Sequence, residues 1–341
     1  MQGRKPGKLG WSLIAIAALL AVLTGAFLYG VKNHGLAMLD WADRTMAGTK
    51  GARQVLDGAA YGPLPAQKVD VFVPETPGPH PVLVFVPGGG WHSGTAGQYH
   101  FIGRQFARLG YVTVLAGYRL VPDGIYPRML EDSAKAVRWT LDHAGEMGGD
   151  PQKIYLMGQS AGAYNVVMLG LERQWLGRAG VPDGTVKGVI GLSGPYDFYP
   201  FTSDSARNAF GHVPDPAVTQ PIHYARADAP PMLLLTGDVD TTVKPRNSFA
   251  LAKALTAAGT PTQAVVIKGA SHEDTLPAGR PRPSRRSPRT TPATGTSYRR
   301  SHCSAARPAE PSRPASASCA PCSARACRPT RSRPPPTAAP G

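Results

Sequence analysis

The chain has 341 residues and a formal net charge of +15, a length that can hold one large α/β domain or two smaller ones. The charge is unevenly distributed. The segment 278–341 has 13 arginines against the single acid Glu310, so it carries +12 of the total. The high charge therefore gives no reason to expect a nucleic-acid partner for the rest of the chain.

The N-terminus combines a basic segment, residues 1–9, with an apolar run of about 21 residues over 10–30, GWSLIAIAALLAVLTGAFLYG. At 1.5 Å per residue such a run spans a hydrocarbon core of ~30 Å, and the preceding basic residues favour a cytoplasmic N-terminus. The pattern predicts a transmembrane signal anchor with the globular part of the chain on the non-cytoplasmic side. A cleaved signal peptide ending near Ala26 is the alternative, and it would give a secreted or periplasmic protein.

Residues 31–59 are predicted to be a linker, and residues 60–276 an α/β domain in which β-rich runs alternate with helical patterns. This rhythm is typical of a mostly parallel central sheet with helices on both faces. The run 68–74 alternates polar and apolar residues and is expected at the sheet edge. The proline-containing segment 199–230 is expected to form an insertion or cap over one end of the sheet. Strands are expected at 68–74, 81–87, 111–118, 153–158, 188–194, 231–237 and 263–269, and helices near 98–109, 128–145, 161–173 and 246–259.

The apolar pattern stops at Leu276, and residues 277–341 form an Arg/Pro/Ala/Ser-rich tail without the side chains needed to bury a face. The tail is predicted to be disordered. It resembles an out-of-frame translation of a GC-rich gene, with a genuine basic extension as the alternative. All four cysteines lie in it, and the pair Cys319 and Cys322 lacks the second pair or βαβ context of a metal or redox site. No metal and no cofactor is expected.

A serine stands at the corner between a predicted strand and a predicted helix, in the sequence Gly158-Gln159-Ser160-Ala161-Gly162. In a Gly-x-Ser-x-Gly turn the serine adopts a strained backbone that lifts its hydroxyl above the sheet. The glycines avoid clashes with the neighbouring strand and helix. The N-terminus of the following helix favours developing negative charge. The pattern predicts that Ser160 is a nucleophile rather than a structural turn residue.

The nucleophile needs a base that is oriented by an acid, and in this kind of fold the partners follow in the order Ser, Asp, His. His272 comes directly after the last predicted strand and is the candidate base. Asp238 and Asp240 follow the strand 231–237, and either could be the acid, the other serving a turn. Both positions lie past the C-terminal ends of strands, where open α/β sheets gather functional groups.

A glycine run, Gly88 to Gly90, lies in the stretch VPGGGWHSG after the second predicted strand. Successive glycines let the backbone approach a ligand closely, as the amides of an oxyanion hole must do. A phosphate cradle is the alternative, but no Gly-Lys-Ser/Thr sequence follows.

These motifs together carry a family resemblance. The stretches PGGGW, GGDPQKIYLMGQSAGAYN, GDVDTTV and GASH resemble the α/β-hydrolase superfamily, in the esterase/lipase branch of hormone-sensitive-lipase-like proteins, carboxylesterases and feruloyl-esterase-like proteins. The resemblance covers about two thirds of the chain. It implies an α/β-hydrolase fold and a serine hydrolase that cleaves small-molecule carboxylic esters through a Ser-His-Asp triad and an acyl-enzyme.

The resemblance also assigns roles to residues. It selects Asp240, the last Asp of a Gly-x-x-Asp-x-x-Val pattern, as the acid that accompanies Ser160 and His272. It implies that the oxyanion hole is formed by the amides of Gly89 and Gly90 together with the amide of Ala161.

Two departures from the family pattern matter. Pro87 stands where the family usually has a histidine that braces the glycine loop. No helical pattern follows His272, so the last strand is expected to leave an apolar face uncovered and the protein to be poorly stable or inactive. The alternatives to an esterase are an amidase of the arylformamidase type and a non-catalytic or inactivated hydrolase-fold protein.

Overall fold

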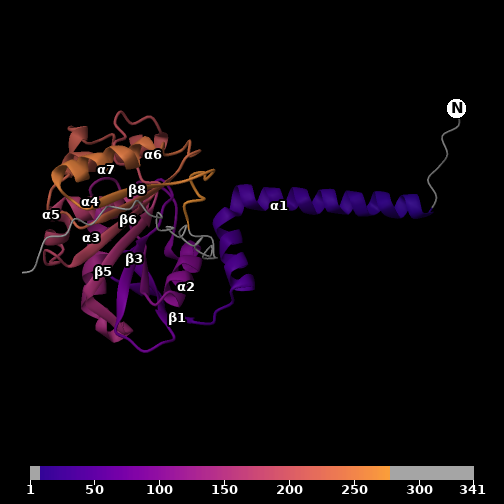
Figure 1. Ribbon diagram of the computed structural model, residues 1–341, viewed down its shortest axis with the longest axis horizontal. Coiled ribbons are helices and arrows are strands. Elements are labelled where there is room, and N and C mark those ends of the chain that lie inside the picture. The colour runs from indigo at the N-terminus through magenta and orange to yellow at the C-terminus, as the bar shows by residue number, and fades with distance from the viewer. Residues whose placement is uncertain (1–7, 277–341) are drawn as a thin grey trace, which may run out of the picture. The chain divides into compact units, whose positions relative to one another are not determined.

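One eight-stranded sheet organises the computed structural model, which describes residues 8–276 (Figure 1). The strand order is β1-β2-β4-β3-β5-β6-β7-β8. The pairs β1–β2 and β2–β4 are antiparallel and the remaining pairs are parallel. The mostly parallel sheet predicted from the sequence is therefore confirmed. The strands are β1 (Ala52–Ala60), β2 (Lys68–Pro74), β3 (His80–Val86), β4 (Val112–Ala116), β5 (Gly149–Gln159), β6 (Val186–Leu192), β7 (Met232–Gly237) and β8 (Thr262–Ile267).

Helices lie on both faces of the sheet, as predicted. Side chains of α3, α4 and α7 join the apolar cluster on one face, and those of α2 join the cluster on the other. The segment 199–230, expected to be irregular, holds one short helix and two 3₁₀ turns. The helices are α1 (Lys8–Met46), α2 (His100–Arg108), α3 (Arg128–His143), α4 (Ala161–Leu171), α5 (Arg173–Arg178), α6 (Asp204–Phe210) and α7 (Arg246–Ala258), with 3₁₀ turns η1 (Ala96–Tyr99), η2 (Gly145–Met147), η3 (Pro216–Thr219) and η4 (Pro221–Tyr224).

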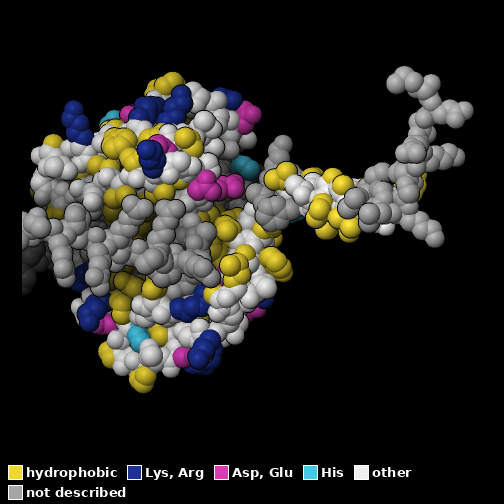
Figure 2. Space-filling model, turned by 45° about the vertical axis from the view of Figure 1, so that its right-hand side comes forward, with side chains coloured by type: hydrophobic (Ala, Val, Ile, Leu, Met, Phe, Trp, Pro, Cys, Tyr) yellow, Lys and Arg dark blue, Asp and Glu magenta, His cyan; other side chains and the backbone are white. Residues whose placement is uncertain are grey.

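Helix α1 has two parts that meet at His34, where the backbone angles are non-helical (φ −135°, ψ 34°). In the described part of the chain, no single helix is long and apolar enough to cross a membrane. The two parts Ile16–Gly30 and His34–Met46, bent by 107°, reach that length and composition together. The first part exposes apolar side chains (Figure 2). We call the second part, His34–Met46, the proximal segment.

Buried ion pairs hold the proximal segment to α2. The guanidinium of Arg104 donates to Asp43 and to Asp40, each at 2.6 Å, and Arg108 donates to Asp43 at 2.8 Å. The side chains of Arg104 and Asp43 are only 5% and 3% exposed. Charge-assisted hydrogen bonds between buried partners are short and directional, so the proximal segment has a defined position on the α/β domain.

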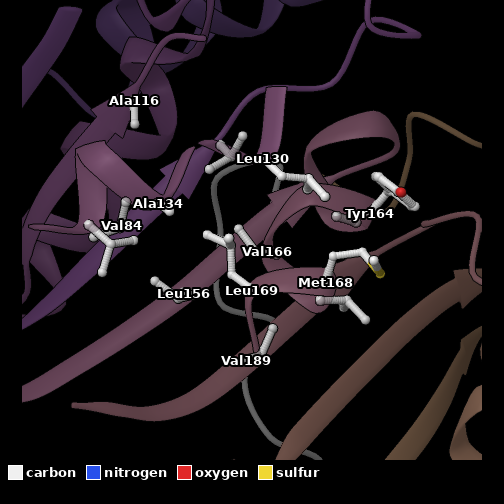
Figure 3. Close-up of a cluster of buried hydrophobic side chains, with 14 of the residues drawn as sticks. Val84, Ala116, Leu130, Ala134, Leu156, Tyr164, Val166, Met168, Leu169 and Val189 are labelled. Atoms are coloured by element: carbon white, nitrogen blue, oxygen red, sulfur yellow. The ribbon is translucent and has the colours of Figure 1, made fainter. Parts of the chain in front are cut away.

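The first face of the sheet is densely packed from β2 to β7, whereas Val266 on the edge strand β8 is 41% exposed. Leu156 of β5 and Val189 of β6 meet Leu130 of α3 and Leu169 of α4, all of them buried (Figure 3). Helix α4 is buried along its whole length, because it runs between the sheet and its neighbour α3. Burial of this kind is the largest stabilising contribution to a fold.

The second face is packed mainly over its first strands, although Met157 of β5 and Leu192 of β6 are also buried there. Phe72, Leu83, Phe85 and Leu115 are buried there beneath α2. Further along, the parallel register places a row of half-buried apolar side chains on the same face, which we call the open stripe. It consists of Tyr155, Ile190, Leu233, Leu235 and Val265. These side chains are partly buried among the described residues, and the expected lack of a covering helix concerns residues 277–341, which lie outside them.

The linker predicted over 31–59 is mostly regular structure, since residues 31–46 belong to α1. Residues 52–60 form β1, which pairs with β2 through two register shifts near Leu56. The glycine at position 58 has φ +66°, and such an irregularity hides the period-2 pattern by which a strand is recognised.

The prediction of an edge position for 68–74 was also wrong. Strand β2 lies between β1 and β4, and only Lys68 in it is exposed. Its polar residue Asp70 is buried because it accepts hydrogen bonds from the Gly58 amide at 2.6 Å and from His100 at 2.8 Å. The buried, hydrogen-bonded Asp70 therefore gave the strand the same polar and apolar alternation that a solvent-facing residue would give.

Candidate active site

The serine predicted as nucleophile lies on a strained turn between β5 and α4. Ser160 has φ +52° and ψ −117°, a conformation that costs energy for a residue with a side chain. A Cβ atom added at Gly158 would lie 2.3 Å from the carbonyl oxygen of Gly162, and one added at Gly162 would lie 2.0 Å from that of Val86. Both glycines of the motif are thus required by close backbone contacts.

A chain of two hydrogen bonds joins the three predicted catalytic side chains. His272 Nε2 lies 2.8 Å from Ser160 Oγ, and His272 Nδ1 lies 2.8 Å from Asp240 Oδ2. The Asp240 carboxylate is fully buried, and its other oxygen accepts the amides of Thr242 and Val243, each at 2.9 Å. These bonds leave the carboxylate one orientation, with its free oxygen toward the imidazole.

The second candidate acid has a different contact. Asp238 is exposed, and its Oδ1 accepts the Gly269 amide at 2.6 Å, which ties the end of β7 to the turn after β8. The motif left open which of the two aspartates is the acid, and in the structure it is Asp240 that contacts His272. The family resemblance selected the same residue.

The loop that carries His272 is held by short polar contacts. The amide and hydroxyl of Ser271 donate to Asp274 at 2.8 and 2.6 Å, and these bonds lower the pKa of Asp274. Thr275 Oγ1 donates to the His272 carbonyl at 3.2 Å and also contacts Ser193 Oγ. None of these contacts could be predicted from the sequence, because the residues are small and polar and lie in a loop without a recognisable pattern.

The glycine loop predicted as an oxyanion hole follows β3. Gly89 and Gly90 have φ +111° and +59°, values that glycine adopts readily and other residues rarely do. The carbonyl of Gly89 accepts the amides of His92 and Ser93 at 3.2 and 3.0 Å, which closes the loop into a tight turn. Ala161, the third predicted donor, begins α4 directly after the nucleophile.

Tyrosines brace this loop where the family has a histidine. Tyr118 donates to the carbonyl of Pro87 at 3.2 Å, and both groups are buried. Burial raises the pKa of Tyr99 to about 12, an effect that a hydrogen bond from the Gly88 amide opposes. The departure at Pro87 is therefore offset by side chains that are distant in sequence.

A tryptophan anchors the far end of the same loop. Trp91 has φ +63°, unusual for a bulky residue, and its ring is buried against Tyr164 and Phe210 at centroid distances of 5.5 and 4.8 Å. Its indole N–H donates to Asn165 Oδ1 of α4 at 3.3 Å. The loop is thus joined to the helix that begins at the nucleophile.

One group of metal-type ligands occurs among the described residues, formed by Asp57, Asp70 and His100. Asp70 already pairs with His100 and with the Gly58 amide, so the group is explained by packing of β1, β2 and α2. Ester hydrolysis by a serine nucleophile needs no metal or cofactor.

The sheet order and the serine turn define the class: the protein is an α/β hydrolase of the esterase/lipase type. The chain belongs to the BD-FAE family, which it matches over residues 69–255.

Curated relatives and solved structures agree with this assignment. The isoprenylcysteine alpha-carbonyl methylesterase ICME of Arabidopsis thaliana is 28% identical over 245 residues, covering 65% of this chain and 57% of that protein. Esterase LipC of Mycobacterium tuberculosis is 31% identical over 208 residues, covering 54% and 50% respectively. The chain thus spans about half the length of the curated relatives it matches.

Among solved structures, the propionate-bound esterase Est2 of Thermogutta terrifontis has a TM-score of 0.53 at 26% identity, covering 66% of this chain and 86% of that one. A truncated carbohydrate esterase from gut microbiota has a TM-score of 0.58 at 20% identity, covering 66% and 90%. The second similarity concerns the fold alone.

Proposed function

We propose that the protein hydrolyses carboxylic esters of small molecules, with Ser160 as nucleophile, His272 as base and Asp240 as the acid that orients it. The observation that carries this proposal is the pair of 2.8 Å hydrogen bonds joining the three side chains. The relatives described above are esterases, which supports the same reaction class. Serine hydroxyls become effective nucleophiles only when a base of this kind removes their proton.

In the first half of the reaction, Ser160 Oγ attacks the ester carbonyl carbon while His272 Nε2 accepts the hydroxyl proton. The oxyanion that forms receives hydrogen bonds from the amides of Gly89, Gly90 and Ala161. The carbon–oxygen bond to the alcohol then breaks, and the alcohol leaves with the proton from His272. Ser160 remains acylated.

In the second half, His272 removes a proton from water, and the hydroxide attacks the acyl carbon. Collapse of the second tetrahedral intermediate releases the carboxylic acid and returns the proton to Ser160 Oγ. Asp240 accepts a hydrogen bond from Nδ1–H throughout, so it keeps the imidazole in the tautomer whose Nε2 faces the serine.

Labelling with a fluorophosphonate probe and turnover of p-nitrophenyl acetate test this proposal. The unaltered protein is expected to do both and Ser160→Ala to do neither, whereas Ser248→Ala, which changes another buried serine, keeps both. Activity of Ser160→Ala within tenfold of the parent would refute the triad, since losing a member costs many orders of magnitude. A protein that neither labels nor turns over ester is a non-catalytic member of the fold. Faster turnover of N-formylkynurenine than of esters indicates an arylformamidase instead.

We further propose that residues 10–30 anchor the protein in a membrane, with the catalytic domain on the non-cytoplasmic side. Support comes from the helical conformation of this run and from its exposed apolar side chains, among them Trp11, Leu19 and Leu23. The chain should sediment with membranes and resist carbonate extraction, whereas a variant starting near Leu36 should be released. A mature N-terminus near Phe27 would instead establish a cleaved signal peptide.

A further inference from the structure

We propose that the proximal segment of α1 lies along the membrane surface and seats the active site there, so that the enzyme takes its esters from the lipid layer. This inference rests on the proposed ester hydrolysis and on the proposed anchor. It adds to them the class of substrate and the surface by which the domain meets the bilayer.

The direction of the proximal segment is the first argument. It is bent by 107° from the apolar part of α1, so an apolar part that crosses the bilayer leaves the proximal segment nearly parallel to the membrane plane. A helix in that position must present one side to the domain and the other to the headgroups.

The side chains of the proximal segment divide accordingly. Leu36 and Leu39 pack against the apolar cluster beneath α2, and Asp43 is buried in the ion pairs with that helix. The opposite side exposes Trp41, at 64% of its maximal area, and Arg44. Tryptophan and arginine are the residues that favour the boundary between headgroups and hydrocarbon.

The proximal segment also borders the catalytic loop. A Cβ atom placed on Gly35 would lie 3.4 Å from a carboxylate oxygen of Glu273, the residue after His272. Leu276, the last described residue of that loop, is buried in the same apolar cluster that Leu36 and Leu39 contact. The bend of α1 is therefore adjacent to the base of the proposed triad, and the rigid ion pairs described above keep it there.

This arrangement selects a substrate class. A long acyl or prenyl chain partitions into a bilayer by ~0.8 kcal/mol per CH₂, so esters of this kind are held at the membrane. An active site fixed at the same height reaches such an ester without extracting it. Hydrolysis of a short ester in solution does not depend on where the active site lies relative to the membrane. Comparing the hydrolysis rates of a short soluble ester and a long membrane-bound one therefore tests the arrangement.

The test changes the connection between anchor and domain while keeping the full chain. A 20-residue Gly/Ser insert between Lys32 and Asn33 would let the domain move by about 25 Å relative to the anchor. The same insert between Asp183 and Gly184, an exposed turn before β6, is the matched control. The substrates are p-nitrophenyl acetate in solution and p-nitrophenyl palmitate in phosphatidylcholine vesicles.

We expect the insert after Lys32 to lower palmitate hydrolysis at least about fivefold and to leave acetate hydrolysis within about twofold, because only the seating is lost. The control insert should change neither rate. Unchanged palmitate hydrolysis would overturn the inference, as would equal loss on both substrates, which would make the proximal segment only a part of the active-site fold. Absence of acetate hydrolysis in the unaltered protein would mean that the proposed function itself had failed.

A point variant tests the surface directly. Trp41→Glu should raise the apparent KM for vesicle-borne palmitate several-fold while kcat on acetate stays constant, because a carboxylate is expelled from the interface. Phe249→Glu on α7, which changes an exposed aromatic residue of the opposite face, is the control and should change neither. Equal behaviour of the two variants on vesicles would contradict the seating of this particular surface.

Discussion

The two faces of the sheet differ in how completely they are covered. Helices α3, α4 and α7 bury the first face from β3 to β7, whereas the cluster beneath α2 and the proximal segment of α1 covers the second face only in part. Beyond them the open stripe is half exposed. Packing density determines how strongly a position resists change, so the two faces should respond differently to the same substitution.

The proposed catalytic residues depend unequally on these two faces. Ser160 directly precedes α4, which is buried on the first face, so the nucleophile is supported by the dense core. His272 belongs to a loop whose last described residue, Leu276, packs on the second face. The nucleophile is therefore expected to be stable in position, and the base to depend on a few polar contacts and on α1.

The largest expected effect tests whether His272 is held in the correct orientation although its loop is less well supported than the nucleophile. Asp240→Asn should lower kcat by about 10⁴-fold, because an amide stabilises the wrong tautomer of His272. Asp238→Asn removes only a bond to the Gly269 amide and should cost less than about tenfold. Steady-state kinetics on p-nitrophenyl acetate measure both, and the reverse ranking would transfer the acid role to Asp238.

Adjacent leucines in β7 compare the two faces directly. Leu234 is fully buried on the first face, and Leu235 is half-buried on the second. Leu234→Ala should reduce the free energy of unfolding by about 2–5 kcal/mol and Leu235→Ala by about 1–2 kcal/mol, since a half-exposed side chain loses less contact. Urea denaturation followed by circular dichroism measures the difference. Equal losses would show that the open stripe is covered in solution.

Most of the sheet could be predicted because each buried strand is a run of apolar residues bounded by glycine or proline. Every predicted strand and helix is present with ends shifted by a few residues. The failures have specific causes. Gly58 and the register shifts near Leu56 hid β1, and Asp70 imitated an edge residue because its partners, His100 and the Gly58 amide, come from other elements.

The candidate site was predictable to the extent that it consists of local motifs. The Gly-x-Ser-x-Gly turn can be recognised from the sequence alone, and so can the positions of Asp240 and His272 after predicted strands. The braces cannot, because Tyr99 and Tyr118 reach the glycine loop only after folding. The contact between Gly35 and Glu273 spans most of the chain and has no sequence pattern at all.

A smaller effect is expected when the Tyr118 brace of the glycine loop, which belongs to the well-packed first face, is removed. Tyr118→Phe leaves the buried carbonyl of Pro87 without its donor, so the oxyanion amides should be less well aligned. We expect kcat to fall about three- to tenfold with little change in KM. Tyr224→Phe removes a similar bond, from Tyr224 to the Val218 carbonyl at 2.9 Å, and should leave kcat unchanged.

The smallest effect concerns the polar turn that supports His272 on the sparsely covered side. Hydrogen bonds from the Ser271 hydroxyl and amide lower the pKa of Asp274. A carboxyl with a lowered pKa in the folded state contributes stability that is complete above its unfolded value of ~3.9 and is lost as the pH falls through the folded value. Asp274→Asn should therefore lower the thermal midpoint by about 1–3 °C at pH 7.

The pH dependence of that difference distinguishes a charge effect from a merely structural one. The difference in thermal midpoint between the parent and Asp274→Asn should persist at pH 5 and close as the pH falls below about 3.9. At low pH the parent carboxyl becomes protonated and is then neutral, like the amide of the variant. Ser271→Ala should produce a similar loss, and the double variant should be scarcely worse than either, since both substitutions remove the same bonds. A constant gap at all pH values, or additive losses, would mean that the turn is held by packing, and that the loop of His272 depends chiefly on Leu276 and the proximal segment of α1.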